Sequence, residues 1–283
     1  MRVLIQKEDY IRTLIVSNKT NRKHLNDDNL LKLKLEFYQL MIMYYLHEKI
    51  FIDVAKCYKV IYDFIREIEL KLTNSSTLDQ KYVDLAKQVL SMENKKTLFE
   101  NYVMYLCVCP PELETRNMLN ELNIFYRKDL EELPDMDHIV KRRLADDLIL
   151  ITNDFLGRFA GCPIFQLSAL NPNAKEHFIL FRRQLIQHNL IIFQKFFSNV
   201  HLGRIGEMIC IEKNEVELEL ADMVINKYLY AKINRMTGTV VFKPKQDGNG
   251  KLADIGLDLT KMLKTMETTC HLIHKENLKH DIR

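Results

Sequence analysis

The side chains of this sequence that could hold a metal ion are cysteines and histidines at short spacings. Cys107 and Cys109 are one residue apart, but no second cysteine pair stands at the spacing that zinc sites use. Cys270 and His274 are four residues apart, so a helix would place them on one face, where they could share a metal ion. Two ligands without a third make a weak site, and we interpret both residues as packing positions. The sequence therefore predicts no metal site.

Patterns typical of catalysis or cofactor binding are also missing from the sequence. It contains no HExxH motif and no glycine-rich phosphate loop, and Gly248-Asn249-Gly250 is interpreted as an isolated surface turn. The acidic pairs Glu131-Glu132 and Asp146-Asp147 lie in charged helical stretches, which is typical of solvated carboxylates. We find no nucleophile beside a base. The prediction is a protein without catalytic residues and without a cofactor, and not an enzyme.

Composition places the chain among ordinary globular proteins. It has 283 residues, of which 47% are hydrophobic and 28% charged, so it can bury a sizeable core. The net charge of +3 is too small to indicate a polyanionic partner. The longest apolar run, Leu40–Leu46, is too short to cross a membrane, and charged residues near Met1 argue against a signal peptide. A large helical chain has no need of disulfides, so its six cysteines favour a reducing compartment.

The chain up to about Val108 predicts antiparallel helix pairs. Apolar residues recur at helical spacing from Leu4 to Ile15, from Leu31 to Tyr45 and from Ile50 to Ile68, with polar joints between these stretches. No proline precedes Pro110, so long helices should dominate. Two architectures fit this pattern, an α-solenoid of stacked helix pairs and a plain helical bundle.

The stretch from His188 to Phe242 predicts a winged helix. Its expected elements are three helices at about His188–Val200, Gly203–Cys210 and Asn214–Lys227, followed by β-rich segments at Leu229–Asn234 and Thr239–Phe242. The loop between the β-rich segments ends at Gly238, which is free to take the positive φ that such a loop needs.

Winged helices most often bind nucleic acids through the third helix, which enters the major groove. Between Ile211 and Asn226, however, five carboxylates stand against one lysine. Glu215, Glu219 and Asp222 are expected on one exposed face, where they would repel phosphates. A protein-interaction module is therefore favoured over a DNA-binding one, and no nucleic-acid partner is predicted. The basic pair Arg182-Arg183 is interpreted as a solvated helix face, with a surface for an acidic partner as the alternative.

Several stretches resemble a known family. They are His188–Phe242 with Cys270–Glu276 and, upstream, Tyr10–Asn21, Leu31–Ile42, Cys57–Asp63 and Lys128–Lys141. These residues resemble the PCI-domain subunits of the 26S proteasome lid. The resemblance implies a mainly α fold, in which a helical-repeat solenoid leads into a winged-helix (PCI) domain and a long C-terminal helix. The expected parts are the solenoid at 1–108, the helical half of the PCI domain at 109–187, its winged-helix half at 188–243, and a linker with a C-terminal bundle helix at 244–283.

The resemblance also implies a function. A member of this family would be a non-catalytic scaffold subunit of the proteasome regulatory particle lid, in the cytoplasm and the nucleus, and would serve ubiquitin-dependent protein degradation. Its partners would be other PCI subunits of the lid, the lid deubiquitinase and the ATPase ring, with no nucleic acid and no membrane. The alternative is a subunit of a sister PCI complex, the signalosome or a translation initiation factor, and a winged-helix DNA-binding protein is less favoured. The family has further helical repeats before the point that matches Met1, so the N-terminal part is expected to be missing or shortened.

Two surfaces are predicted to contact neighbouring subunits. The first is the hairpin, through Tyr230, Lys232 and Arg235, because hairpin edges are left unpaired and tyrosine is enriched in interface cores. The second is a helix after the linker, whose apolar residues recur at alternating steps of three and four and form a narrow seam. The seam consists of Leu252, Ile255, Leu259, Met262, Met266 and Ile273. We favour a seam shared with other subunits, and packing on its own winged helix is the alternative.

Overall fold

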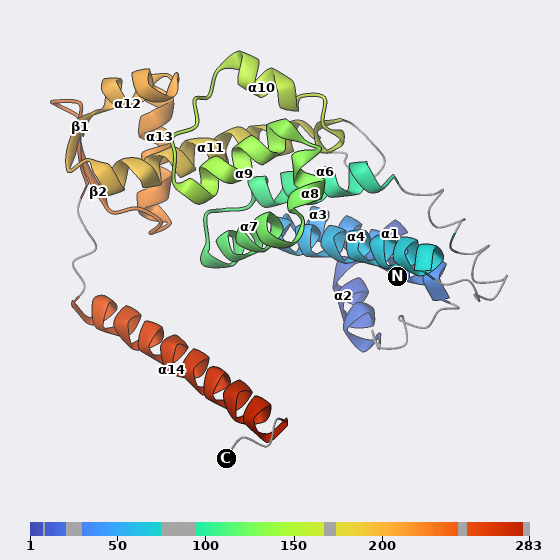
Figure 1. The fold of residues 1–283 in the computed structure, drawn as a ribbon. Helices are drawn as coiled ribbons and strands as arrows, with labels where there is room; N and C mark the ends of the chain where they lie inside the picture. The colour runs from blue at the N-terminus through green and yellow to red at the C-terminus, as the bar shows by residue number, and fades with distance from the viewer. Residues whose placement is uncertain are drawn as a thin grey trace.

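The computed structural model describes residues 1–7, 9–20, 30–74, 86, 94–166, 174–242 and 248–279. Within these ranges the fold is mainly helical and contains a small sheet (Figure 1). A stack of helices leads into a winged helix, and a long helix follows at the C-terminal end. The expected fold class is confirmed.

The chain begins with two short helices, α1 (Arg2–Gln6) and α2 (Tyr10–Lys19). The single helix predicted over this stretch is wrong, because the Asp9 side chain accepts a hydrogen bond from the Arg12 backbone N–H at 3.2 Å and caps a new helix. The buried face of α2 also differs from the apolar pattern. Thr13 and Ser17 are buried, whereas Ile11 is exposed.

Three long helices form the centre of the stack. They are α3 (Leu31–His47), α4 (Phe51–Asn74) and α6 (Lys95–Val108). α4 packs against both of the others. Aromatic side chains pack between these helices. The ring centroids of Tyr62 on α4 and Phe99 on α6 lie 5.0 Å apart. The Tyr126 hydroxyl beside them donates to Oδ1 of Asp63 at 2.5 Å, so a buried polar group there is satisfied.

A second group of shorter helices covers this centre. It contains α7 (Leu113–Phe125), α8 (Arg127–Glu131), α9 (Pro134–Ala145), α10 (Asn153–Phe159) and the 3₁₀ helix η3 (Pro163–Phe165). The buried Arg143 of α9 donates to the carbonyl oxygens of Leu106 at 3.3 Å and Cys107 at 3.1 Å. These carbonyls belong to the last turn of α6, where a cation complements the helix dipole.

The winged helix comes next in the chain and begins with a long helix. Its elements are α11 (Ala174–Phe196), β1 (Asn199–His201), α12 (Leu202–Ile209), α13 (Lys213–Ile225), β2 (Ala231–Asn234) and β3 (Thr239–Phe242). The antiparallel sheet has the order β1-β3-β2, and Val240 of β3 lies opposite both Val200 and Ile233. Gly238 has a φ of +64°, as expected for the loop. α11 runs across the predicted boundary at residues 187 and 188, so it contributes to both halves.

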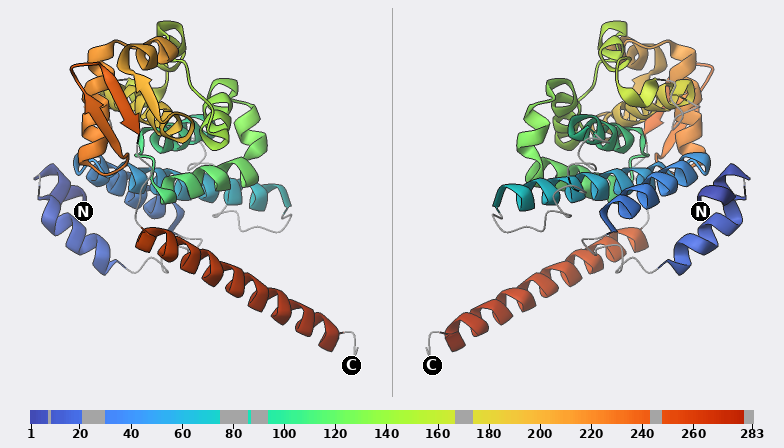
Figure 2. Two further views of the ribbon diagram at one scale, coloured as in Figure 1. Left: turned by 90° about the vertical axis from the view of Figure 1, so that its left-hand side faces the viewer. Right: turned by 90° about the vertical axis from the view of Figure 1, so that its right-hand side faces the viewer.

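The C-terminal helix α14 (Gly248–Lys279) stands apart from the helical stack in the views of Figures 1 and 2. Its described side chains are all exposed. The surface turn predicted for Gly248-Asn249-Gly250 is wrong, because these residues form the start of the helix. A glycine costs little at a helix terminus, where the backbone is only half helical.

Candidate interaction surfaces

The acidic face of α13 is turned toward α11. Arg182 donates from Nη2 to Oε2 of Glu215 at 2.8 Å, and Arg183 donates from Nε to Oε2 of Glu219 at 2.9 Å. The other arm of Arg183 bonds to Asp222. The expectation that these carboxylates form an exposed face is therefore wrong, and so is the interpretation of Arg182-Arg183 as a solvated helix face. Each charged set is the partner of the other within the same chain.

The pKa of Arg183 responds to this arrangement. Burial lowers it, but the hydrogen bond and charge of Glu219, together with those of Asp222, outweigh burial and raise the pKa above its ordinary value. Gln187, one turn further along α11, also donates to Oε2 of Glu219 at 3.3 Å. These ion pairs tie α13 to α11, while the buried Val216, Leu220 and Met223 set the rotation of α13 about its own axis.

The outward face of α13 is aliphatic. Leu218 is 70% exposed and Ile225 is 73% exposed, and a helix places residues seven apart on the same side. A helix that enters the major groove presents hydrogen-bonding side chains to the base edges at such positions. The structure thus disfavours DNA binding by α13 for a different reason from the repulsion that the sequence suggested. The carboxylates are neutralised within the chain, and apolar side chains occupy the outer face.

The hairpin residues lie at the rim of the winged helix. Tyr230 is 37% exposed and directly precedes β2, and Lys232 points outward from that strand. β2 is an edge strand, because it pairs with β3 and ends the sheet order. Arg235 differs from the other two, since its Nε donates to Oε1 of Glu217 at 2.7 Å and ties the wing loop to α13. The part that these residues take in an interface stays a prediction.

The winged helix is joined to the preceding segment of the chain by buried polar groups that the sequence interpretation missed. Asn189 of α11 is fully buried, and its amide accepts from the Ile149 N–H at 2.8 Å and donates to the Ile149 carbonyl at 2.7 Å. The Ile151 N–H then donates to the Ile209 carbonyl at 3.3 Å, which connects this segment to α12. A polar residue within an apolar helical stretch is the signal that could have marked Asn189, because such a group needs a partner when buried.

The predicted seam lies along α14. Ile255, Leu259, Met262, Met266 and Ile273 are each between 54% and 59% exposed. Leu263, one turn after Leu259, widens the apolar surface at 65% exposure, and Leu272 is 63% exposed on another side of the helix. The side chain of Leu252 lies outside the described residues. The seam is thus an uncovered apolar face in this structure, and its occupant stays a prediction.

The two candidate metal-binding pairs lie in different parts of the fold. Cys107 and Cys109 are buried, whereas Cys270 and His274 are exposed on α14, and all six cysteines are free. Burial raises the pKa of the Cys109 thiol to about 12. No group of three or more metal-ligating side chains occurs in the part of the chain that the structure describes.

None of the described helices is both long enough and apolar enough to span a membrane.

Two family descriptions match parts of this chain. Residues 1–69 match the family described as PSMD12/CSN4, N-terminal, and residues 162–244 match the PCI domain. The second match begins before α11 and ends after β3, so it contains the complete winged helix.

The chain is similar over nearly its whole length to proteasome subunits. It is 26% identical over 306 residues to the 26S proteasome non-ATPase regulatory subunit 12 homolog A of Arabidopsis thaliana, covering 99% of the chain and 63% of that protein. It is 27% identical to the 26S proteasome non-ATPase regulatory subunit 12 of Dictyostelium discoideum, with 100% and 57% covered. For the 26S proteasome regulatory subunit RPN5 of Saccharomyces cerevisiae the identity is 26%, with 100% and 58% covered. The resemblance to lid subunits, and to subunit 12 among them, is confirmed, and the chain spans about three fifths of the length of these relatives.

Proposed function

We propose that this chain is a non-catalytic scaffold subunit of the 26S proteasome regulatory particle lid. Support comes from the relatives described above, which are named as 26S proteasome regulatory subunits and match the chain nearly from end to end. In this role the chain holds neighbouring subunits in place and so serves ubiquitin-dependent protein degradation, in the cytoplasm and the nucleus. The proposed partners are other PCI subunits of the lid, the lid deubiquitinase and the ATPase ring.

The observation that carries the proposal is the uncovered apolar face of α14. A helix of 32 residues exposes Leu259, Met262 and Met266 by more than half. Full burial of each such side chain contributes roughly 1.5–3 kcal/mol, so a bundle with helices of other subunits would be strongly favoured over exposure to water. Large exposed apolar patches are typical of protein interfaces.

The winged helix supports the same function. Its outward α13 side carries the aliphatic residues Leu218 and Ile225, and its edge strand β2 carries Lys232 beside Tyr230. We propose that these surfaces contact adjacent PCI subunits. Apolar and tyrosine side chains at such positions suit a protein partner, whereas phosphate binding requires free cations.

A sister PCI complex is the second candidate. The N-terminal family description names CSN4 together with PSMD12, so that match by itself does not separate the lid from a related assembly. The curated relatives reported above favour the lid, because each of them is named as a proteasome subunit.

Native purification tests the proposal directly. The endogenous chain is tagged in its source cells, its assembly is isolated at physiological salt, and the partners are identified by mass spectrometry. Lid PCI subunits and the lid deubiquitinase in amounts equal to the tagged chain would support the proposal. Recovery of signalosome or initiation-factor subunits in their place would show that the chain belongs to a sister complex.

A further inference from the structure

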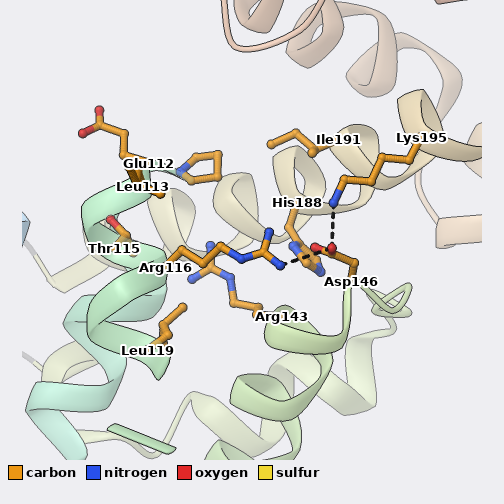
Figure 3. A pocket seen from close by; sticks show the side chains of 11 residues that line it. Glu112, Leu113, Thr115, Arg116, Leu119, Arg143, Asp146, His188, Ile191 and Lys195 are labelled. Atoms are coloured by element: carbon orange, nitrogen blue, oxygen red, sulfur yellow. Dashed lines mark hydrogen bonds and ion pairs between the residues drawn. The ribbon is translucent and has the colours of Figure 1, made fainter. Parts of the chain in front are cut away.

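A cavity of about 250 Å³ lies where the start of α7, the end of α9 and the C-terminal part of α11 meet (Figure 3). It belongs neither to the hairpin nor to α14, so the proposed scaffold function does not use it. Its lining combines two kinds of side chain. Leu113, Leu119 and Ile191 are aliphatic, and Arg116, Arg143 and Lys195 are cationic, and both α7 and α11 contribute side chains of each kind.

The charges around the cavity are unequal. Asp146 accepts from Lys195 at 2.6 Å and from Arg116 at 3.4 Å, as the dashed lines in Figure 3 mark. Its neighbour Arg143 bonds to backbone carbonyls, and the described part of the chain gives it no carboxylate partner. With Glu112 at the rim, three cations stand against two carboxylates. The cavity therefore has room for one further negative charge.

One side chain of this cavity lacks a carboxylate partner, and another lacks a hydrogen-bond partner. The Arg143 side chain is only 7% exposed, and a buried cation without an anion carries a desolvation cost that a bound carboxylate would offset. Thr115 is 2% exposed, and its Oγ1 has no hydrogen-bond partner. Buried hydroxyls are nearly always hydrogen-bonded, so an acceptor is expected beside Thr115 in the functional state.

We propose that this cavity binds the C-terminal residue of a partner polypeptide, with its carboxylate among Arg116, Arg143 and Lys195 and an aliphatic side chain against the aliphatic residues of the lining. A chain end carries a carboxylate and a side chain on the same carbon, which matches a lining that places cationic and aliphatic side chains close together. An internal Asp or Glu would use the cations but leave the aliphatic side chains uncovered. A phosphate group would bring a second negative charge close to Asp146, which favours a monoanion.

The test uses the whole chain and a defined probe, the peptide acetyl-Gly-Gly-Leu with a free carboxylate. Binding is measured by calorimetry and by the NMR shift of the Ile191 methyl group, which lines the cavity. Hydrogen bonds to a charged group are worth enough that the C-terminal amide of the same peptide should bind at least roughly tenfold more weakly. Equal binding of acid and amide, or binding that leaves the Ile191 signal unmoved, would overturn the proposal.

Two further probes separate the possible sources of the carboxylate. Acetyl-leucine presents the same end without the preceding peptide, and acetyl-Gly-Gly-Glu-Gly-amide presents an internal acidic side chain. Weaker binding of both supports a polypeptide end. Equal binding of acetyl-leucine would make this a site for a small carboxylate, and equal binding of the glutamyl peptide would make it a site for an internal acidic residue, and either result overturns the assignment.

Variants with opposite expected effects guard against misfolding. Asp146→Asn should bind the probe more tightly, by roughly tenfold, because it frees Arg116 and Lys195, and asparagine tolerates the left-handed φ of 56° at this position. Thr115→Val and Lys195→Gln should each weaken binding. Lys141→Gln is the matched control, since it removes the same charge from an exposed pair with Asp137 outside the cavity. Weaker probe binding by Asp146→Asn would refute the carboxylate site. An equal loss of probe affinity in Lys195→Gln and in the Lys141→Gln control would also refute it.

Discussion

Arg183 on α11 donates from Nε to Oε2 of Glu219 on α13 at 2.9 Å, and this contact pairs the acidic side of α13 within the chain. With its carboxylates held against α11, the helix turns Leu218 and Ile225 toward solvent. The buried Val216, Leu220 and Met223 set the rotation of the helix, and the ion pairs neutralise the carboxylates beside that buried face. The outer side of α13 is therefore apolar, with no uncompensated acidic surface. That outcome suits a module that binds other proteins.

Replacement of Arg183 tests this contact. Arg183→Met should lower the free energy of unfolding by about 1–2 kcal/mol, because Glu219 is only 16% exposed at its side chain and would lose its charged partner. Urea unfolding followed by circular dichroism measures the change. Arg158→Met is the matched control, since its 3.5 Å pair with Asp135 is exposed and should be worth less than about 0.5 kcal/mol. Equal decreases in the free energy of unfolding of the two variants would contradict the structural role of Arg183.

Two glycines of α12 offer a sharper comparison. A Cβ on Gly206 would lie 2.6 Å from the backbone oxygen of Ile211, whereas one on Gly203 would meet nothing within 4 Å. Gly206→Ala should therefore cost about 1–3 kcal/mol, because the backbone must move to relieve the clash. Gly203→Ala should be neutral or stabilise by up to about 1 kcal/mol, through the better helix propensity of alanine. Thermal unfolding of both variants measures these changes. A Gly206→Ala protein as stable as the original chain would show that the turn after α12 can move without cost.

His188 should make stability depend on pH. Burial and the nearby Arg143 lower its pKa from 6.5 to about 4, against the opposing effects of the hydrogen bond to the Asp147 carbonyl and of the Asp146 charge. Because the folded pKa lies below the unfolded one, protonation favours unfolding. The contribution of His188 is complete above pH 6.5 and is lost as the pH falls toward 4, with a slope of up to about 1.4 kcal/mol per pH unit.

The variant His188→Gln isolates this contribution. Glutamine cannot be protonated in this range but can still donate to the Asp147 carbonyl, which the His188 Nε2 contacts at 3.2 Å. Stability between pH 6.5 and pH 4 should fall less steeply in the variant than in the original chain. The carboxylates titrate in both proteins, so the difference between the two curves reports the histidine. Parallel curves would mean that His188 is not held neutral.

The sequence predicted the winged helix well, because each of its elements carries a local pattern. Apolar spacing marked α12 and α13, and the loop needed a residue such as Gly238. The ion pairs between α13 and α11 could not be predicted from the sequence, for a physical reason. Helical periodicity placed Glu215, Glu219 and Asp222 on one side, but whether that side meets water or a basic helix depends on tertiary packing.

The N-terminal error has a similar origin. Apolar spacing alone extends one helix from Leu4 to Ile15, but a single side chain, Asp9, ends that pattern by capping a second helix. A cap competes locally with helix continuation, and periodicity does not weigh that competition. The cavity was likewise invisible in the sequence. Arg116, Arg143 and Lys195 come from three separate helices, and only the fold brings them together.

A charge at the hairpin tests the predicted contact with neighbouring subunits. Tyr230 is 37% exposed, so Tyr230→Asp should leave the free energy of unfolding within about 0.5 kcal/mol of the original value. In an interface the same change would bury a carboxylate, and incorporation into the assembly should fall severalfold. Quantitative mass spectrometry of the native assembly measures the effect. Normal incorporation of a folded variant would count against a contact at Tyr230.

Removal of the C-terminal helix tests the seam. The described side chains of α14 are all exposed, so a chain that ends before Leu252 should melt within about 2 °C of the full chain. It should nevertheless fail to enter the lid, because the apolar face that we propose its partners bury is gone. A large fall in the melting temperature would mean that α14 packs on its own domain.

Substitutions within the full-length helix separate the seam from helix length. Leu259→Ser with Met266→Ser removes two seam residues that are 54% and 55% exposed, and it should reduce incorporation strongly, since each fully buried side chain is worth roughly 1.5–3 kcal/mol. Lys261→Ser with Lys264→Ser changes the opposite face by the same number of residues and should leave incorporation nearly unchanged. Both variants keep the helix length, and their helix content by circular dichroism should be equal. If the lysine variant is excluded from the assembly as strongly as the seam variant, the contact depends on charge or on the helix as a whole, and the seam is not the surface that the partners bind.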